Sequence, residues 1–185
     1  MALEEYRTTL SDTAPDLSSR YFLTSGFASS SMYLHPRYRA GAAFRHIGRE
    51  AKGRRLQILA FAQKPETAEL ITSFHLVEGT AVILVQGLAW VDPESYQILR
   101  MRTDLLVPRP DIRLDRQTTE IEFGEVRFEQ VARRLRLPRK VVVTVDWQQT
   151  VYRNQHSYSD FSLLADEMRK ENKQPVLPKR GGETS

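Results

Sequence analysis

Hydrophobic and polar residues alternate along most of the chain between residues 21 and 165, with the two-residue period of a β-strand. The most regular stretch is RKVVVTVDW, whose alternate positions place Val141, Val143, Val145 and Trp147 on one face and Lys140, Val142, Thr144 and Asp146 on the other. Successive side chains of a strand point to opposite faces of its sheet. We therefore expect the first set to be buried and the second to face solvent or a thin covering layer.

Pairs of alternating segments that are joined by short polar stretches predict antiparallel hairpins. Residues 40–63 predict one hairpin that turns at EAKG, and residues 80–106 predict another that turns at DPE. A third hairpin is predicted to join residues 135–147 to residues 151–164 through the turn QQT.

Four segments depart from simple alternation. Residues 20–34, RYFLTSGFASSSMYL, predict one long or broken strand that is interrupted near Gly26. Residues 64–74 begin with Pro and Glu and predict one or two helical turns, whereas the two prolines of residues 107–117 predict an extended connector. In the segment TTEIEFGEVRFEQV the alternation changes phase at Gly124, which predicts a β-bulge.

These elements amount to seven to nine strands that are joined by short turns. Short turns force neighbouring strands to run antiparallel, and a long twisted meander curls. We predict a mainly β fold, a curved antiparallel meander sheet or half-barrel with few short helices and an apolar concave face. Residues 1–20 are predicted to be a polar N-terminal segment with a possible short helix, residues 21–165 the half-barrel domain, and residues 166–185 a flexible charged tail.

Composition narrows the class of protein. The chain of 185 residues is 41% hydrophobic and 27% charged, which suits one globular domain. It has no cysteine, so disulfides, thiol nucleophiles and zinc–thiolate sites are excluded. No apolar run reaches the roughly 18 residues of a membrane helix, so no transmembrane segment is expected. The segment MALEEYRTTLSD lacks the basic and apolar regions of a signal peptide.

The polar residues of the chain do not form a catalytic pattern. His156, Ser159 and Asp160 resemble a triad, but on a strand His156 and Asp160 lie about 13 Å apart and Ser159 points to the other face. The acids are expected in a turn, as for Asp92 and Glu94, or paired with neighbouring arginines, as for Asp104, Asp111 and Asp115. The four histidines lie in separate segments. We expect no catalytic residue, no metal site and no cofactor.

Residues 35–55 hold seven Lys or Arg residues against a single Glu50, with Tyr38 and Phe44 among them. Such a segment could bind single-stranded nucleic acid by stacking and phosphate contacts, or face anionic lipid headgroups. A solvated outer face is the commoner meaning of this pattern, and we favour it. The net charge is +4, and 21 of the 27 basic residues are arginines. Arginine suits phosphate or carboxylate binding, but a GC-rich genome also encodes most basic positions as arginine, and we favour this second explanation.

The segments GLAWVDPESYQILRMRTDL, TTEIEFGEVRF and LRLPRKVVVTVDWQQTVYRNQHSYSDFSLL carry a resemblance over about residues 80–165. A strand that ends in a turn acid, an LP-x-x-V strand start, and a last strand with Tyr158, Asp160 and Phe161 are similar to the LolA/LolB-like half-barrel superfamily of outer-membrane lipoprotein-sorting proteins. More narrowly, the chain resembles uncharacterised envelope proteins of acidobacterial type. That family opens with a signal peptide and a long N-terminal helix, whereas this N-terminus is short and polar.

The resemblance implies an eleven-strand-like half-barrel with helices across its mouth, an apolar cavity for acyl chains, and a periplasmic or envelope location. We therefore expect a non-enzymatic protein that binds a lipid, a lipoprotein acyl chain or another apolar ligand on the concave face. The candidate ligand-binding residues are Trp90, Met101, Phe123, Phe128, Trp147 and Tyr158. Of these, Trp90 is expected to pack at the rim of the curved sheet.

The alternative hypothesis is a structural envelope component that docks another protein and holds no small ligand. The two hypotheses differ at the concave face. A concave face filled by the protein's own aromatic side chains, including Phe123, Phe128, Trp147 and Tyr158, favours the structural component. A pocket of several hundred Å³ lined by those positions favours ligand binding. Nucleic-acid binding is the least favoured form of binding.

Overall fold

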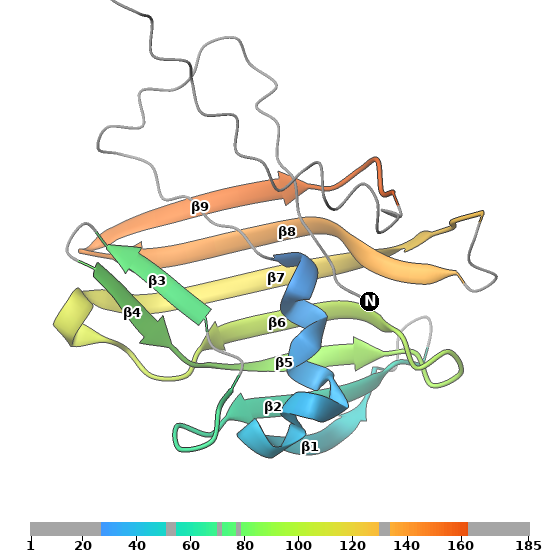
Figure 1. The fold of residues 1–185 in the computed structure, drawn as a ribbon, viewed down its shortest axis with the longest axis horizontal. Helices are drawn as coiled ribbons and strands as arrows, with labels where there is room; N and C mark the ends of the chain where they lie inside the picture. The colour runs from blue at the N-terminus through green and yellow to red at the C-terminus, as the bar shows by residue number, and fades with distance from the viewer. Residues whose placement is uncertain (1–26, 51–54, 70–71, 77–78, 130–133, 163–185) are drawn as a thin grey trace, which may run out of the picture.

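The computed structural model describes residues 27–50, 55–69, 72–76, 79–129 and 134–162 (Figure 1). The predictions for residues 1–20, for residues 166–185 and for most of the EAKG turn lie outside the described residues. In the described part of the chain, no helix is long and apolar enough to cross a membrane.

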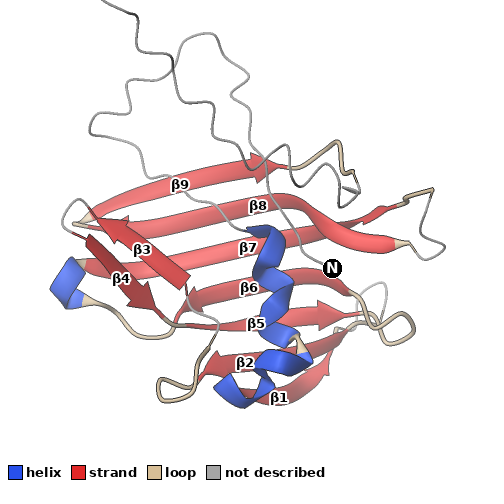
Figure 2. Cartoon of the chain, viewed as in Figure 1, coloured by secondary structure: helices blue, strands red, loops and turns tan. Residues whose placement is uncertain are grey.

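Seven antiparallel strands form the main sheet, and strands dominate the described residues (Figure 2). They are β1 (Ala42–Arg49), β2 (Gln57–Gln63), β5 (Val85–Val91), β6 (Ile98–Leu105), β7 (Leu114–Val126), β8 (Leu135–Trp147) and β9 (Thr150–Ser157). Their order is β1-β2-β5-β6-β7-β8-β9, so β1 and β9 are the two edges and the sheet does not close into a barrel. The prediction of a mainly β fold built on a curved antiparallel meander sheet is confirmed.

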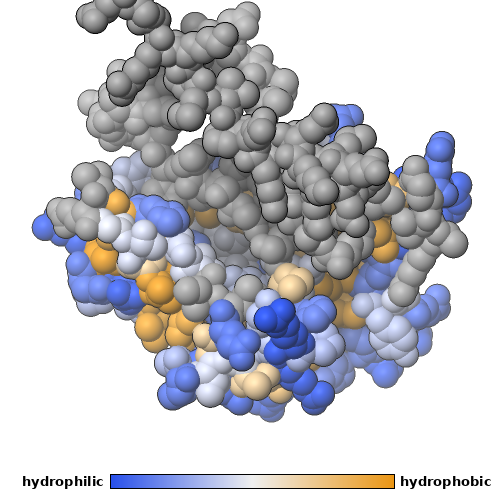
Figure 3. All heavy atoms as spheres, in the orientation of Figure 1, coloured by the Kyte–Doolittle hydropathy of each residue, from blue (hydrophilic) through white to orange (hydrophobic). Residues whose placement is uncertain are grey.

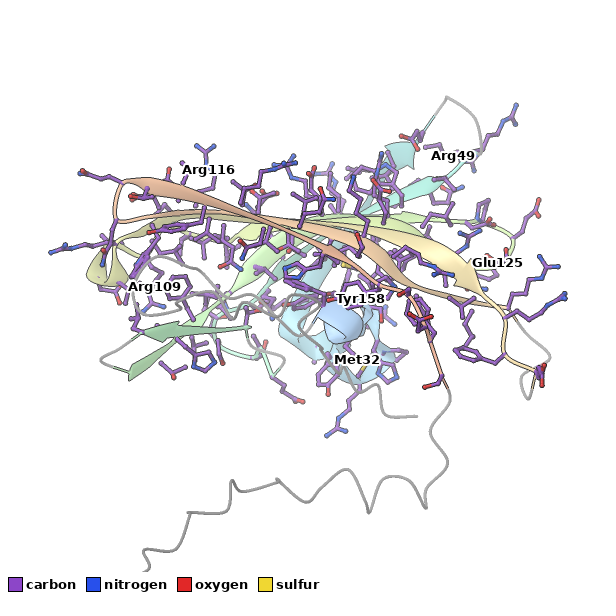
Figure 4. The ribbon with its side chains drawn as sticks, turned by 90° about the horizontal axis from the view of Figure 1, so that it is seen from above. Met32, Arg49, Arg109, Arg116, Glu125 and Tyr158 are labelled. Atoms are coloured by element: carbon purple, nitrogen blue, oxygen red, sulfur yellow. The ribbon has the colours of Figure 1, made fainter. Side chains whose placement is uncertain are left out.

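A second layer covers one face of this sheet. It consists of the 3₁₀ helices η1 (Phe27–Leu34) and η2 (Pro36–Gly41) and of a hairpin of β3 (Thr72–Leu76) and β4 (Gly79–Ile83). In Figure 4 the helix that carries Met32 and this hairpin lie on the same side of the sheet, and Arg116 points away on the other side. We call the covered side the inner face and the opposite side the outer face.

Strand register assigns each side chain to one of the two faces. Met101, Ile121 and Val141 are cross-strand neighbours on the inner face. The residues that follow them in the chain alternate to the outer face, so Arg102 and Val142 lie there.

The segment that was predicted as a strand at residues 20–34 is helical from Phe27 onward, so this part of the prediction is wrong. Its apolar anchors explain the error. Phe27 and Tyr33 are six residues apart, and a spacing of six places two side chains on the same face of a strand and also of a 3₁₀ helix with three residues per turn. Both anchors pack on the core of the inner face. The spacing of the apolar residues therefore fits a strand and a 3₁₀ helix equally well, and packing on the sheet selects the helix.

Two other predicted segments also differ. The described residues among 64–74 form no helix: the N–H groups of Thr67 and Ala68 donate to the Lys64 carbonyl in a turn, and β3 begins at Thr72. The segment TAVILVQGLAW is not one strand, because β4 ends before Leu84 and pairs with β3 in the inner layer, while β5 starts after it. The connector at residues 107–117 is extended only in part.

That connector contains the short helix η3 (Pro110–Ile112). Arg113 then takes a left-handed conformation with φ of 56° and ends this helix, after which β7 begins at Leu114. The left-handed residue lets the Arg113 N–H bond back to the Pro110 carbonyl.

The phase change at Gly124 marks a real irregularity of pairing. Between Glu122 and Phe123 the register with β8 skips one residue, Arg139, so the extra residue of the bulge belongs to β8. A Cβ atom at Gly124 would overlap with Cγ of Arg139. The glycine therefore leaves room for the side chain of the bulged residue on the neighbouring strand.

The core lies between the inner face and its covering layer. From the sheet it takes Ala89, Met101, Leu114, Ile121, Phe123, Val141, Val143 and Val145, and from the cover Phe27, Phe74 and Ile83. Val141, Val143 and Val145 are at most 1% exposed, as their alternation predicted, and Trp147 is half-buried. Of the opposite set, Lys140 is exposed and the others are half-buried. The inner face of the central strands is thus filled by the protein's own side chains.

Candidate ligand-binding hollow on the outer face

The structure places four of the six predicted ligand-binding residues, Met101, Phe123, Trp147 and Tyr158, in or against the core of the inner face. Met101, Phe123 and Phe128 are buried, with exposed fractions of 0%, 8% and 8%. Trp147 lies on the inner face, where its ring meets Phe74 edge-on at 6.0 Å. Its Nε1–H donates to the carbonyl of Ile112 at 2.9 Å.

The last two predicted residues differ in their position. Tyr158 packs beside the inner core, and its backbone N–H donates to the Arg139 carbonyl at 2.9 Å. Trp90 lies on the outer face, because its neighbour Ala89 is fully buried on the inner one. Met101, Phe123, Trp147 and Tyr158 thus pack on the inner face, and Trp90 lies on the opposite face.

An open hollow of about 360 Å³ lies on the outer face across β1, β2, β5 and β6. None of the six predicted residues lines this hollow. The side chains that point to the outer face and line it are Ala43, Arg45, Ala60, Ala62, Gln86, Leu88 and Asp104. The other lining residues, Phe44, Phe61 and Gly87, belong to the inner face by alternation.

The register arranges the hollow in two rows of cross-strand neighbours. In one row Arg45 faces Ala60, Ala60 faces Leu88, and Leu88 faces Arg102. The other row runs through Ala43, Ala62, Gln86 and Asp104. The hollow spans three spacings between strands, or about 14 Å, from β1 to β6.

Small side chains create the hollow. Alanine ends at Cβ, so Ala43, Ala60 and Ala62 leave space between the longer side chains of the flanking positions. The floor is therefore alkyl in character, formed by these alanines and Leu88. The backbone beneath belongs to a paired sheet, so the N–H and C=O groups of β2 and β5 are engaged with neighbouring strands on both sides, whereas β1 pairs only with β2.

The wall on β6 is a closed ion-pair cluster. Nε and Nη2 of Arg102 donate to the two carboxylate oxygens of Asp104, each at 3.0 Å, and the Thr118 hydroxyl donates to Asp104 at 2.7 Å. Partial burial opposes the charge of Asp104. The hydrogen bonds from Arg102 and Thr118, with the charges of Arg102 and Arg116, outweigh this effect and hold the pKa of Asp104 below its ordinary value.

The wall on β1 is different, because it carries the exposed side chain of Arg45. Within the part of the chain that the structure describes, no ion pair or hydrogen bond engages the Arg45 guanidinium. As far as the described residues go, the hollow thus has an unpaired cation on one side and a neutralised pair on the other.

One end of the hollow is flanked by a stacked cluster. The guanidinium carbon of Arg100 lies 3.9 Å from the centre of the Trp90 ring, and Arg100 Nη2 donates to Glu50 at 3.1 Å. Trp90 is the next outward residue after Leu88 on β5, so its ring borders the floor. The cation–π contact and the ion pair hold this border in place.

The residues with catalytic potential remain dispersed. The Ser159 hydroxyl donates to the neighbouring Asp160 at 2.6 Å, whereas the His156 ring packs on Phe27 with ring centres 5.2 Å apart. Arg109 pairs with Asp111 at 2.7 Å, as the interleaved charges predicted. Among the described residues no group of three His, Asp or Glu side chains could hold a metal ion.

The described part of the basic segment at residues 35–55 is largely exposed, which suits a solvated surface, a nucleic-acid surface and a lipid surface alike. Hydrophilic residues prevail where η2 and β1 reach the surface at the lower edge of the view in Figure 3. Arg37 lies over the Tyr38 ring at 5.6 Å. Phe44 turns to the inner side and contacts Phe61, with ring centres 6.5 Å apart.

The hollow was not anticipated from the sequence. Its one local signal is the occurrence of alanine at alternate positions of β2, Ala60 and Ala62. Comparison of the chain with protein-family models, with curated proteins and with solved structures found no match.

Proposed function

We propose that the protein is a non-enzymatic binding protein that holds the apolar part of a ligand in the outer hollow. The observation that carries this proposal is the alkyl floor of Ala43, Ala60, Ala62 and Leu88 within a space of about 360 Å³. Pockets for small ligands start at roughly 300 Å³ and combine an apolar lining with a few polar groups. The hollow lies at the lower end of this range and has such polar groups in Arg45 and Gln86.

The inner face is the less favourable place for a ligand. A ligand there would displace Phe27, Phe74 or Ile83, each at most 8% exposed, from the core. Loss of a buried Phe or Ile contact costs about 2–5 kcal/mol, which few weak ligands could offset. The outer hollow needs no such displacement, and the hydrogen-bonded sheet beneath it is a rigid support.

A lipid or an acyl chain is the ligand class that we propose, since the floor offers alkyl contacts and no row of hydrogen-bond donors. The resemblance of residues 80–165 to envelope proteins adds a periplasmic or envelope location to the proposal. Fractionation of cells that express the full-length gene with a C-terminal tag tests this location. Recovery of the tagged protein in the cytosol alone would contradict it.

Filling the hollow tests the proposed site. Ala60→Phe places a ring on the floor, and Val142→Phe places the same ring on the outer face at β8, away from the hollow. We expect the wild type and Val142→Phe to bind a fluorescent fatty-acid probe with equal affinity, and Ala60→Phe to bind it at least about tenfold more weakly. Urea unfolding of all three proteins confirms that each is folded.

Equal binding by Ala60→Phe, or no binding by the folded wild type, would reject the proposed site. Organic extraction of the purified protein followed by mass spectrometry identifies a lipid that is carried from the cell. A lipid that is retained by Val142→Phe and lost from Ala60→Phe would support the proposal.

A protein-interaction module is the second candidate function. It is favoured by the openness of the hollow and by its position beside β1, an edge strand of the sheet. Unpaired groups of an edge strand can pair with a strand of another protein. A photo-crosslinking residue at position 60 that captures one discrete protein in cells, while the same residue at position 142 captures none, would favour this module over a lipid-binding protein.

A further inference from the structure

We infer that the hollow selects single-chain amphiphiles with a carboxylate head, and that Arg45 is the residue that recognises the head. This inference rests on the proposed function, because it names the ligand class of the same hollow. The apolar chain would lie across Ala60 and Leu88, with the head at β1.

The distribution of charge around the hollow determines this orientation. On the β6 side, Asp104 is matched by two hydrogen bonds from Arg102 and one from Thr118. An acidic head placed there would meet a carboxylate whose cation is already engaged. On the β1 side, the Arg45 guanidinium has no partner among the described residues. The acidic head is therefore stabilised at β1 and disfavoured at β6.

The register places the head and the chain in one line. Arg45 faces Ala60 on the neighbouring strand, and Ala60 faces Leu88 on the next. A ligand whose carboxylate meets Arg45 thus has its first methylene groups above Ala60 and the following ones above Leu88. Both positions are half-buried alkyl side chains, which an extended hydrocarbon covers without exposing a polar group.

The chemistry of arginine favours a carboxylate over other head groups. A guanidinium presents two parallel N–H donors that match the two oxygens of a carboxylate. A hydroxyl head can accept one of these hydrogen bonds and brings no charge, and an ammonium head is repelled. Because Arg45 is exposed, water and salt weaken the ion pair, and we expect a preference of about three- to tenfold at low salt.

Displacement of an apolar fluorophore measures this preference. N-phenyl-1-naphthylamine is bound to the wild type and displaced by dodecanoate, dodecanol or dodecylamine at low salt. We expect dodecanoate to displace it at a concentration about three- to tenfold lower than dodecanol, and dodecylamine to be the weakest. In high salt the difference between acid and alcohol should shrink.

Variants of Arg45 assign the preference to one residue. The ratio compares the concentration of dodecanol that displaces the fluorophore with the concentration of dodecanoate that does so. In Arg45→Gln this ratio should fall close to one. In Arg45→Lys it should lie between the ratios of Arg45→Gln and of the wild type. Arg153→Gln is the matched control, since Arg153 is an exposed arginine on the outer face at β9, far from the hollow. It should keep the wild-type ratio.

The outcomes separate this inference from the proposed function. If the fluorophore binds and the acid and the alcohol displace it equally, the hollow binds apolar ligands and the role of Arg45 is refuted. That role is refuted as well if Arg153→Gln lowers the ratio as much as Arg45→Gln does. If the folded wild type binds neither fluorophore nor amphiphile, the proposed function fails and the inference fails with it.

Discussion

The phenol oxygen of Tyr33 lies 2.6 Å from the hydroxyl oxygen of Thr72, and this hydrogen bond joins η1 to β3. The two residues are 39 positions apart in the chain. The Tyr33 ring also stacks on Phe61 of β2, with ring centres 5.7 Å apart. Burial raises the pKa of the phenol above its ordinary value of 10.0 against the opposing effect of the Thr72 hydrogen bond, so Tyr33 is neutral at pH 7. One side chain thus links both parts of the covering layer to the sheet.

Replacement of Tyr33 by Phe should loosen this layer. Tyr33→Phe removes the hydrogen bond and keeps the ring, so we expect a loss of about 0.5–1.5 kcal/mol in the free energy of unfolding. Hydrogen exchange of the β3 and β4 amides should become faster than that of β7 and β8. Tyr38→Phe is the control, because no hydrogen bond of its hydroxyl occurs among the described residues. Unchanged exchange of β3 and β4 in Tyr33→Phe would contradict the linking role.

The faces of β8 differ in their tolerance of charge. Val143 is 1% exposed on the inner face, so Val143→Asp buries a carboxylate without a partner, at a cost of several kcal/mol that can exceed the stability of the domain. Thr144→Asp changes a half-buried residue on the outer face, opposite Arg153, and should alter stability by about 0.5 kcal/mol. Urea unfolding of the two variants measures the difference. Equal midpoints would show that the register of β8 is wrong.

Gly87 allows the close approach of Phe61 on the inner face. A Cβ atom at Gly87 would lie 2.9 Å from Cε1 and Cζ of the Phe61 ring and would also overlap with the carbonyl oxygen of Arg102. We expect Gly87→Ala to destabilise the protein by about 1–3 kcal/mol through overpacking. Gln86→Ala, at the exposed neighbouring position, should change stability by less than about 0.5 kcal/mol.

A double variant identifies the atoms that cause this strain. Phe61→Leu removes the ring and should recover part of the loss in Gly87→Ala, because the overlap with the backbone of β6 remains. Additive effects of the two substitutions in thermal unfolding would argue against a direct contact between position 87 and the ring.

The Asp104 carboxylate should make stability depend on pH in the acid range. Its pKa is lowered in the folded protein from the ordinary value of 3.8, so the unfolded chain takes up the proton first as the pH falls. The stabilisation is complete above pH 3.8 and is lost as the pH falls through the lower folded pKa. For an exposed pair it amounts to at most about 1 kcal/mol.

Asp104→Asn should therefore unfold at a lower urea concentration than the wild type at pH 7, and the two midpoints should converge toward pH 3. Asp115→Asn is the control, because it removes a carboxylate that has no ion-pair partner within the described residues. Its urea midpoint should change between pH 7 and pH 3 by about as much as the midpoint of the wild type. If the urea midpoints of Asp104→Asn and the wild type differ by the same amount at every pH in this range, the ion pair of Arg102 and Asp104 does not cause the dependence of stability on pH.

The alternation of residues determined much of this fold by itself. The side-chain period of a strand is local, so the pattern of residues 139–147 predicts which valines are buried before any partner strand is known. The hairpin at QQT was predicted from the polar break between two alternating segments, and Gln148 and Gln149 form its turn with positive φ values of 51° and 61°. Arg102 and Asp104 share a face two residues apart, so their pairing was also local information.

The tertiary structure decided what depends on distant segments. The strand β4 leaves the main sheet because β3 and the inner face offer it a partner and a core, and no local pattern marks the break at Leu84. The spacing of Phe27 and Tyr33 fits a strand and a 3₁₀ helix equally, and packing on the sheet selects the helix.

The hollow is also decided by register. Ala43 and Ala62 form part of one floor because β1 and β2 pair with a particular offset, and Arg45 stands unpaired because no acidic residue of the described chain reaches it. A register shift of a single residue would move every one of these side chains to the other face. Each of these side chains is ordinary in the sequence, and the site exists only where four strands bring them together.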